Sequence, residues 1–261
     1  QRVMDRHDIL RTGVVWDGLQ QPSQVVWRQA RLPVQALQLN PADGDIAAQL
    51  HGLFDARHYR LDVTRAPLLR LVRADDRLNQ RIVATLLFHH MALDHSALEV
   101  VCHEMQACLL GQGAALGQAV PFRNYVAQAR LGISEPEHEN FFRQMLGDIS
   151  EPTLPYGLQD VQGDARGIGE VSLPLPAALS RRLRAQARQL GVSAASLFHM
   201  GWAQVLAVLA GKEQVVFGTV LMGRMQGSHA TDRALGIFIN TLPFRVDVDA
   251  QDLRTGVKAT H

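Results

Sequence analysis

The sequence predicts an α/β fold, and three observations in its first 110 residues carry that prediction. Residues Arg81 to Phe88 (RIVATLLF) form an apolar, β-branched run that is typical of a largely buried strand. A polar loop follows, and a helix is predicted after it. Ser96 and Glu99 have the spacing of a capping box at its start, and apolar residues then recur at helical spacing. Upstream, Leu68 to Arg73 alternates apolar and basic residues, which predicts a second strand that pairs with the first across a turn at 75–79.

The remaining N-terminal residues predict short strands and one helix. Residues 5–16 begin as a short helix and pass into a strand, and residues 24–27 and 32–39 predict extended segments. Residues 45–59 carry apolar side chains at helical spacing, and Asp45 is in position to cap that helix. We expect all these elements to form one α/β lobe.

Three helices are predicted in the second half of the sequence. Residues 135–146 follow serine and proline start signals. Residues 176–190 predict a helix with an exposed face of four arginines, which is typical of a solvated surface. Residues 193–210 predict a uniformly apolar helix, which we expect to be buried.

A change in composition marks the boundary between two lobes. Residues 150–169 hold prolines and glycines with little periodicity, which indicates a linker or crossover. We therefore assign residues 1–155 to an N-terminal lobe that carries the histidine-containing loop, and residues 156–261 to the linker and a partial C-terminal lobe. The strands predicted in this second lobe are 170–175, 214–220 and 237–248.

Composition and charge argue against several function classes. The 261 residues hold 26 Lys+Arg against 25 Asp+Glu, and a formal charge of +1 gives no electrostatic basis for binding nucleic acid or an acidic membrane. No apolar run reaches the roughly 18 residues of a membrane span, and we expect a cytoplasmic protein. Cys102 and Cys108 fall on different faces of one predicted helix, which argues against a local disulfide or metal pair.

The loop after the predicted 81–88 strand collects titratable side chains, namely His89, His90, Asp94 and His95. A neutral imidazole, whose ordinary pKa is about 6.5, can accept a proton from an attacking amine or hydroxyl and return it to a leaving thiolate. Successive residues leaving a strand point in opposite directions, so His89 and His90 are not expected to share one site. Together with His103 these residues could also bind a metal, but no HExxH or paired i,i+4 spacing is present, and we expect no metal site.

Further motifs follow one another along nearly the whole chain. They are Arg6–Thr12 (RHDILRT), Tyr59–Arg70, His89–His95 (HHMALDH), Pro121–Tyr125 (PFRNY), Val216–Arg224 and Leu235–Val246 (LGIFINTLPFRV). In this order they resemble the motifs of the condensation domains of nonribosomal peptide synthetases, and HHMALDH is similar to that family's His-His-x-x-x-Asp-Gly core. The shared order is more specific than any single motif.

The resemblance implies a chloramphenicol acetyltransferase-like, two-lobed fold, with mixed sheets, flanking helices and a truncated second lobe. It implies an acyltransferase that forms an amide bond between a donor thioester and an acceptor amine in secondary metabolite biosynthesis. No cofactor is expected to bind directly, because phosphopantetheine arms of upstream and downstream carrier domains deliver the substrates, and an adenylation domain is the expected neighbour. Compared with a full family member the chain resembles a fragment, so we expect it to be inactive alone.

The resemblance also implies roles for individual residues. His90 is the candidate catalytic residue, as general base or as the group that positions the nucleophile, while His89 is expected to be structural and hydrogen-bonded. Asn240, within the Asn-Thr-Leu-Pro match, is expected to support the active site.

Asp94 is expected to hold the loop through a salt bridge to an arginine, and Arg11 and Arg224 are the candidates because both lie in matched motifs. In the alternative, Asp94 simply caps the following helix in place of Ser96. His95 stands where the family has glycine and adds bulk and a titrating group beside His90.

Other functions remain open at this point. A small-molecule acyltransferase of the chloramphenicol or plant acyl-CoA type would use the same His-x-x-x-Asp loop. A catalytically degenerate docking module is suggested by His95, and epimerization domains share the His-His-x-x-x-Asp core. Heterocyclization domains are set aside because they carry aspartate in place of the histidines.

Overall fold

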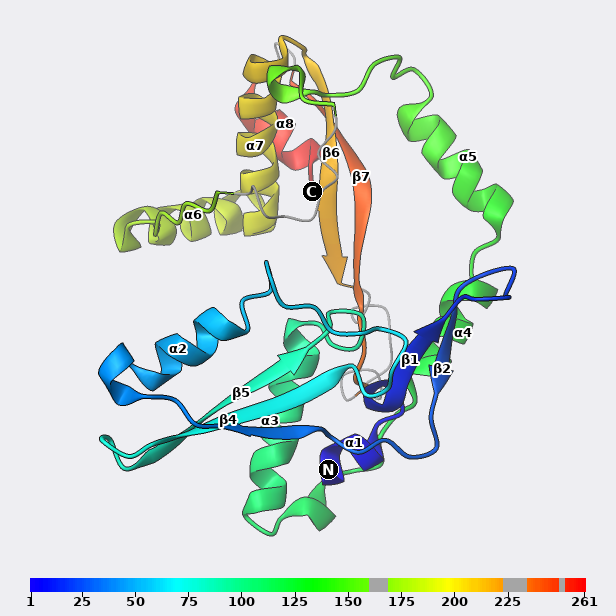
Figure 1. Cartoon of the computed structure of the whole chain (residues 1–261). Coiled ribbons are helices and arrows are strands. Elements are labelled where there is room, and N and C mark those ends of the chain that lie inside the picture. Colours follow the sequence, from blue (N-terminus) through cyan, green and yellow to red (C-terminus); the bar gives the residue numbers. More distant parts are fainter. Residues whose placement is uncertain (160–168, 223–233, 249–251) are drawn as a thin grey trace. The chain divides into compact units, whose positions relative to one another are not determined.

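The computed structural model of the chain describes residues 1–159, 169–222, 234–248 and 252–261, and it divides into two compact units (Figure 1). The first unit comprises Gln1–Gly132 and Met222–Ile239, and the second comprises Ile133–Leu221 and Asn240–His261. The N-terminal segment of the first unit thus ends at residue 132, whereas composition placed the lobe boundary at 155. A later segment, Met222–Ile239, also belongs to the first unit.

The elements of the first unit are α1 (Arg2–Arg6), β1 (Thr12–Val15), β2 (Ser23–Val26), β3 (Val34–Leu37), α2 (Ile46–Leu53), β4 (Leu69–Asp76), β5 (Arg81–Phe88), α3 (His95–Leu109) and α4 (Phe122–Leu131). Those of the second are α5 (Glu135–Leu146), α6 (Ala177–Leu190), α7 (Ala194–Ala210), β6 (Gln214–Met222), β7 (Ile239–Asp247) and α8 (Leu253–Ala259). Helices α4 and α8 were not predicted. Helix α2 ends earlier than predicted because the Asp55 side chain accepts the Arg57 N–H and turns the chain away from the helix.

A three-stranded sheet in the order β3-β4-β5 organises the first unit. Strands β4 and β5 are antiparallel, with Leu69 opposite Phe88 and Asp76 opposite Arg81, so the predicted hairpin is confirmed. Strand β5 was expected to be largely buried, and this is wrong, since it pairs on one side only within the described sheet and exposes Arg81 and Ile82.

The two faces of this sheet pack against different helices because successive strand residues point to opposite sides. On one face, buried residues of α2 pack with sheet residues, and the cluster comprises Ile46, Leu50, Val72, Ala74, Val83 and Leu87. On the other face, residues of α3 pack with the alternate strand positions, in a cluster that includes Ala97, Val101, Leu69, Leu86 and Phe88. The end of β5 and the start of α3 are therefore fixed relative to each other through the core.

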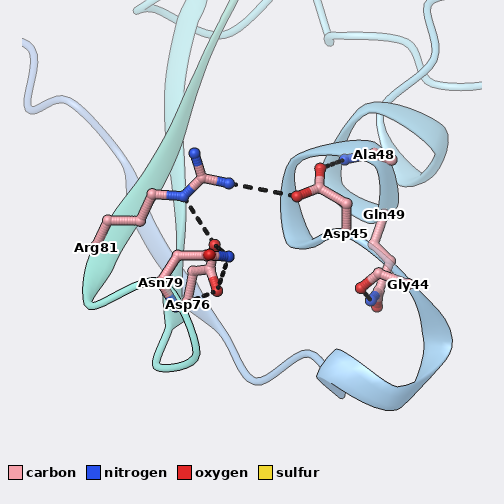
Figure 2. Close-up of polar contacts among 7 residues, drawn as sticks. All are labelled: Gly44, Asp45, Ala48, Gln49, Asp76, Asn79 and Arg81. Atoms are coloured by element: carbon pink, nitrogen blue, oxygen red, sulfur yellow. Dashed lines mark hydrogen bonds and ion pairs between the residues drawn. The ribbon is translucent and has the colours of Figure 1, made fainter.

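A polar cluster ties the turn of the β4–β5 hairpin to the start of α2 (Figure 2). Arg81 Nε donates to Asp76 Oδ2 at 2.8 Å, and Arg81 Nη2 lies 3.3 Å from Asp45 Oδ1. Asp45 in turn accepts the Ala48 N–H at 2.9 Å and caps α2, as predicted. Hydrogen bonds from Asn79 and Arg81 hold the pKa of the buried Asp76 carboxyl below its ordinary value.

The second unit is built on helix α7 and the two-stranded sheet of β6 and β7. Helix α7 buries one side, including Met200, Ala203 and Leu206, but exposes Phe198 and Trp202, so the expectation that it is buried throughout is wrong. The strand predicted at 170–175 is also wrong, since these residues have no regular structure. In the part of the chain that the structure describes, no single helix is long and apolar enough to cross a membrane. Helices α6 and α7 have the required length and apolar composition only when taken together, and the pair is bent by 105°.

Candidate active site

The loop from His89 to Asp94 joins β5 to α3 inside the first unit, and hydrogen bonds hold its first turn. The His89 N–H donates to the Leu68 carbonyl and the Ala92 N–H donates to the His89 carbonyl, both at 2.9 Å. The Met91 N–H donates to His89 Nδ1 at 3.1 Å. Because Nδ1 accepts this bond, the neutral His89 ring carries its proton on Nε2.

His89 and His90 have different surroundings. His89 is half-buried, and burial, together with the nearby charge of His90, lowers the pKa of His89 below its ordinary value. His90 is exposed. The contacts of His89 are those of a residue that shapes the loop, whereas the His90 side chain is accessible to a substrate.

Asp94 fixes the other end of the loop, and its side chain is buried. Its Oδ1 accepts the Ala97 N–H at 2.7 Å, which makes Asp94 the N-cap of α3. Its Oδ2 accepts the Phe238 N–H at 3.0 Å, and its own N–H donates to the Gly236 carbonyl at 3.3 Å. Asp94 thus caps α3, and the predicted capping box at Ser96 is wrong, while the predicted pairing of Asp94 with Arg224 stays a prediction.

The segment that Asp94 contacts belongs to an aromatic cluster. The Phe238 ring lies 4.7 Å from Tyr125 and 5.4 Å from Phe122, both from α4, measured between ring centroids. Gly236 has a φ of 155°, and a Cβ at this position would come within 2.1 Å of the Phe122 ring. Sequence analysis did not single out Gly236 and Phe238, although a glycine followed by an aromatic residue inside the Leu235–Val246 motif was a signal for them.

His95 lies at the first helical position of α3 and is exposed. Its Nε2 is 3.5 Å from Glu99 Oε1, one turn along the helix. The extra bulk of this residue therefore extends into solvent beside Glu99.

The remaining predicted site residues lie elsewhere or outside the described residues. Arg11 Nη1 donates to the carbonyls of Trp27, at 2.6 Å, and Arg28, at 2.8 Å, so the proposed Arg11 pairing with Asp94 is wrong. The guanidinium joins the residues flanking β1 and β2 instead. Arg224 lies outside the described residues, and Asn240 is an exposed residue near the start of β7 in the second unit.

Metal-ligating side chains do not gather into one group in the described part of the chain. Among residues 1–159, 169–222, 234–248 and 252–261, no group of three or more His, Cys, Asp or Glu side chains is arranged to hold a metal ion. The loop instead presents one exposed imidazole beside a buried, hydrogen-bonded carboxylate.

The whole chain, residues 1–261, matches the family model described as Condensation domain. The chain belongs to the condensation domain family. Malpinin synthetase of Mortierella alpina is 53% identical over 261 residues, which are 100% of this chain and 3% of that protein. A linear gramicidin synthase of Brevibacillus parabrevis is 33% identical over 259 residues, covering 95% of this chain and 3% of that protein. The condensation domain thus spans a small part of these relatives' length.

Solved structures share the fold of this condensation domain. A four-domain nonribosomal peptide synthetase bound to AMP and glycine matches with a TM-score of 0.74 at 19% identity, over 99% of this chain and 20% of that chain. The condensation domain of the Monacolin K polyketide synthase matches with a TM-score of 0.74 at 20% identity, over 99% of this chain and 61% of that chain. The resemblance noted in the sequence and the expected chloramphenicol acetyltransferase-like α/β fold are confirmed.

Proposed function

We propose that this domain catalyses amide-bond formation between a donor acyl thioester and an acceptor amine in nonribosomal peptide synthesis. One observation carries the proposal: an exposed His90 sits on a loop that is anchored at both ends, by His89 to the β4–β5 sheet and by Asp94 to the 236–238 segment. A catalytic side chain has to be both accessible and held in place, and this loop provides both.

The chemistry follows from what the loop offers. The acceptor nitrogen attacks the thioester carbonyl, the C–N bond forms, the C–S bond breaks, and the thiol is the leaving group. The His90 imidazole takes the proton that the nitrogen loses and returns it to the departing sulfur. His89 and Asp94 act through the loop that they position, and a supporting role for Asn240 also stays part of the proposal.

Carrier domains are the proposed partners, since the relatives that match are large synthetases of which this domain covers a few per cent. We propose that upstream and downstream carriers present both substrates on phosphopantetheine arms, and that an adenylation domain is adjacent. The cytoplasmic location expected from the sequence stays a prediction.

The experiment is a condensation assay with the full-length protein that contains this domain, supplied with two loaded carrier domains. We expect His90→Ala to lower turnover by about 10²-fold or more, the range of general acid–base catalysis, without loss of stability. His89→Ala should lower turnover less and lower the melting temperature, because the Met91 N–H loses its acceptor. His51→Ala, on the exposed side of α2, is the matched control and should change neither.

Three outcomes would contradict this assignment. A folded His90→Ala protein with near-normal turnover would remove His90 from catalysis. A wild-type protein that binds loaded carriers but forms no product would indicate the docking module. A wild-type protein that inverts the donor stereocentre without forming an amide would indicate an epimerization domain.

A further inference from the structure

Helix α6 carries a continuous arginine face. Arg181, Arg184 and Arg188 recur at three- and four-residue spacing, which places them on one side of the helix over about 10 Å. All three are exposed. The opposite side carries Leu190, which packs against the core of the second unit, so the arginines form the outward face.

Acidic partners are missing around this face in the part of the chain that the structure describes. The sequence contains no Asp or Glu between Glu170 and Glu213, and among the described residues no ion pair or hydrogen bond reaches the three side chains. Other arginines of the same unit are paired, for example Arg245, which bonds Asp148 and Asp247. Among the described residues, an arginine row without acidic partners is therefore a local property of α6.

Positive charge is concentrated on α6 and is not a general property of the chain. The helix contributes four of the 26 basic residues, and the remaining 22 are outnumbered by 25 acidic ones. All four are arginines, which bind carboxylates with two parallel hydrogen bonds, whereas lysine acts as a point charge. A short, isolated row of this kind fits one acidic helix of about two turns, and it is too small to follow a nucleic acid backbone.

We propose that the arginine face of α6 docks an acidic helix of a carrier domain that delivers substrate to this condensation domain. The inference rests on the proposed function and names the surface through which one of its partners approaches. A carrier tethered in the same polypeptide is present at high effective concentration, so the contact can be weak. It has to form and break in every cycle, and exposed charge pairs raise association rates without slowing release as a large apolar interface would.

The test measures binding separately from catalysis. The full-length protein receives Arg184→Glu with Arg188→Glu, and the matched control receives Arg123→Glu with Arg130→Glu on α4, where both arginines are also exposed. The dissociation constant for each excised holo carrier domain of the same synthetase is measured by fluorescence anisotropy at low and high salt. Turnover is measured with the carrier-bound donor and with the same acyl group on free pantetheine.

We expect the α6 variant to bind one carrier about 10-fold or more weakly, and the wild-type affinity for that carrier to fall with salt. Its turnover of the pantetheine thioester should equal that of wild type, and the control should match wild type throughout. Unchanged carrier affinity in the α6 variant would overturn the docking, as would an equal loss in the control. Anionic vesicles that bind wild type but not the α6 variant, with carrier affinity unchanged, would assign the face to a membrane. A wild type that binds its carriers through α6 but forms no amide would refute the proposed function alone.

Discussion

Replacing Asp94 by asparagine should destabilise the first unit while leaving the shape of the side chain almost unchanged. The carboxylate accepts two backbone N–H groups, from Ala97 and from Phe238. Asparagine has one acceptor oxygen, so its amide nitrogen has to face one of the two N–H groups. One buried hydrogen bond to a charged group is lost and a buried donor is left unsatisfied.

The magnitude follows from these two bonds. Asparagine caps a helix nearly as well as aspartate, so the bond to Ala97 can persist with little loss. The lost bond to Phe238 costs about 1.5–3 kcal/mol, the range for buried hydrogen bonds to charged groups. Asp94→Ala loses the cap as well and should cost about 2.5–4 kcal/mol.

Asp45→Asn is the matched control, because Asp45 also caps a helix but its other oxygen faces only the exposed Arg81. The free energy of unfolding of this variant should fall by less than about 1 kcal/mol. Denaturant unfolding can be followed by tryptophan fluorescence in a Trp202→Phe background, where Trp16 and Trp27 report on the first unit alone. Amide formation by the Asp94→Asn protein should also fall, since the loop that carries His90 loses its anchor.

Two results would refute this reasoning. If Asp94→Asn is as stable as Asp45→Asn, the bond to the Phe238 N–H does not hold the segment. If Asp94→Asn is fully stable but inactive, the carboxylate takes part in the chemistry. The predicted partnership with Arg224 is tested in the same background by a double-mutant cycle with Arg224→Ala, in which strict additivity would remove it.

Two further predictions concern the same unit. Gly236→Ala should lower the free energy of unfolding by about 1–3 kcal/mol, because the added Cβ would overlap the Phe122 ring. Gly201→Ala, at a helical position with open space, should raise it by up to about 1 kcal/mol. Equal melting temperatures for the two variants would contradict the overlap. Burial, with the charge of His90, lowers the pKa of His89, so the unfolded chain binds more protons there and wild type should lose stability as pH falls through about 6.5. His89→Asn keeps an acceptor for the loop but does not titrate, and unfolding measured at pH 7.5 and 5.5 should show a smaller pH dependence; identical slopes would disprove the assignment.

Elements whose signals are local were predicted well. The β4–β5 hairpin follows from alternation on both sides of a polar turn, and α5 begins where Ser134 and Glu137 form a capping box. Helix α6 ends at Gly191, which adopts the left-handed conformation that glycine tolerates. In each case the deciding contacts lie within a few residues of one another.

The site could be predicted only in part because its decisive contacts are distant in sequence. Asp94 and Ser96 are both good capping residues, and the choice between them is decided by the Phe238 N–H, which satisfies the second oxygen of Asp94. Arg11 was a reasonable partner for Asp94 because it lies in a matched motif, but its guanidinium donates hydrogen bonds to the carbonyls of Trp27 and Arg28 instead. The exposed side of α7 was missed for a related reason, since composition does not reveal which side of an apolar helix finds a neighbour.

The hydrogen bond between Asp94 and Phe238 joins residues 144 positions apart and has a consequence for synthesis on the ribosome. The chain emerges from its N-terminus at about 5–20 residues per second, so about 7–30 s separate the appearance of the two partners. During that interval the β4–β5 hairpin and α3 can form from local contacts, but the buried carboxylate of Asp94 lacks its second donor. The histidine loop should therefore reach its final conformation late in translation, and silent codon changes between residues 95 and 238 should alter the yield of active protein without altering its sequence.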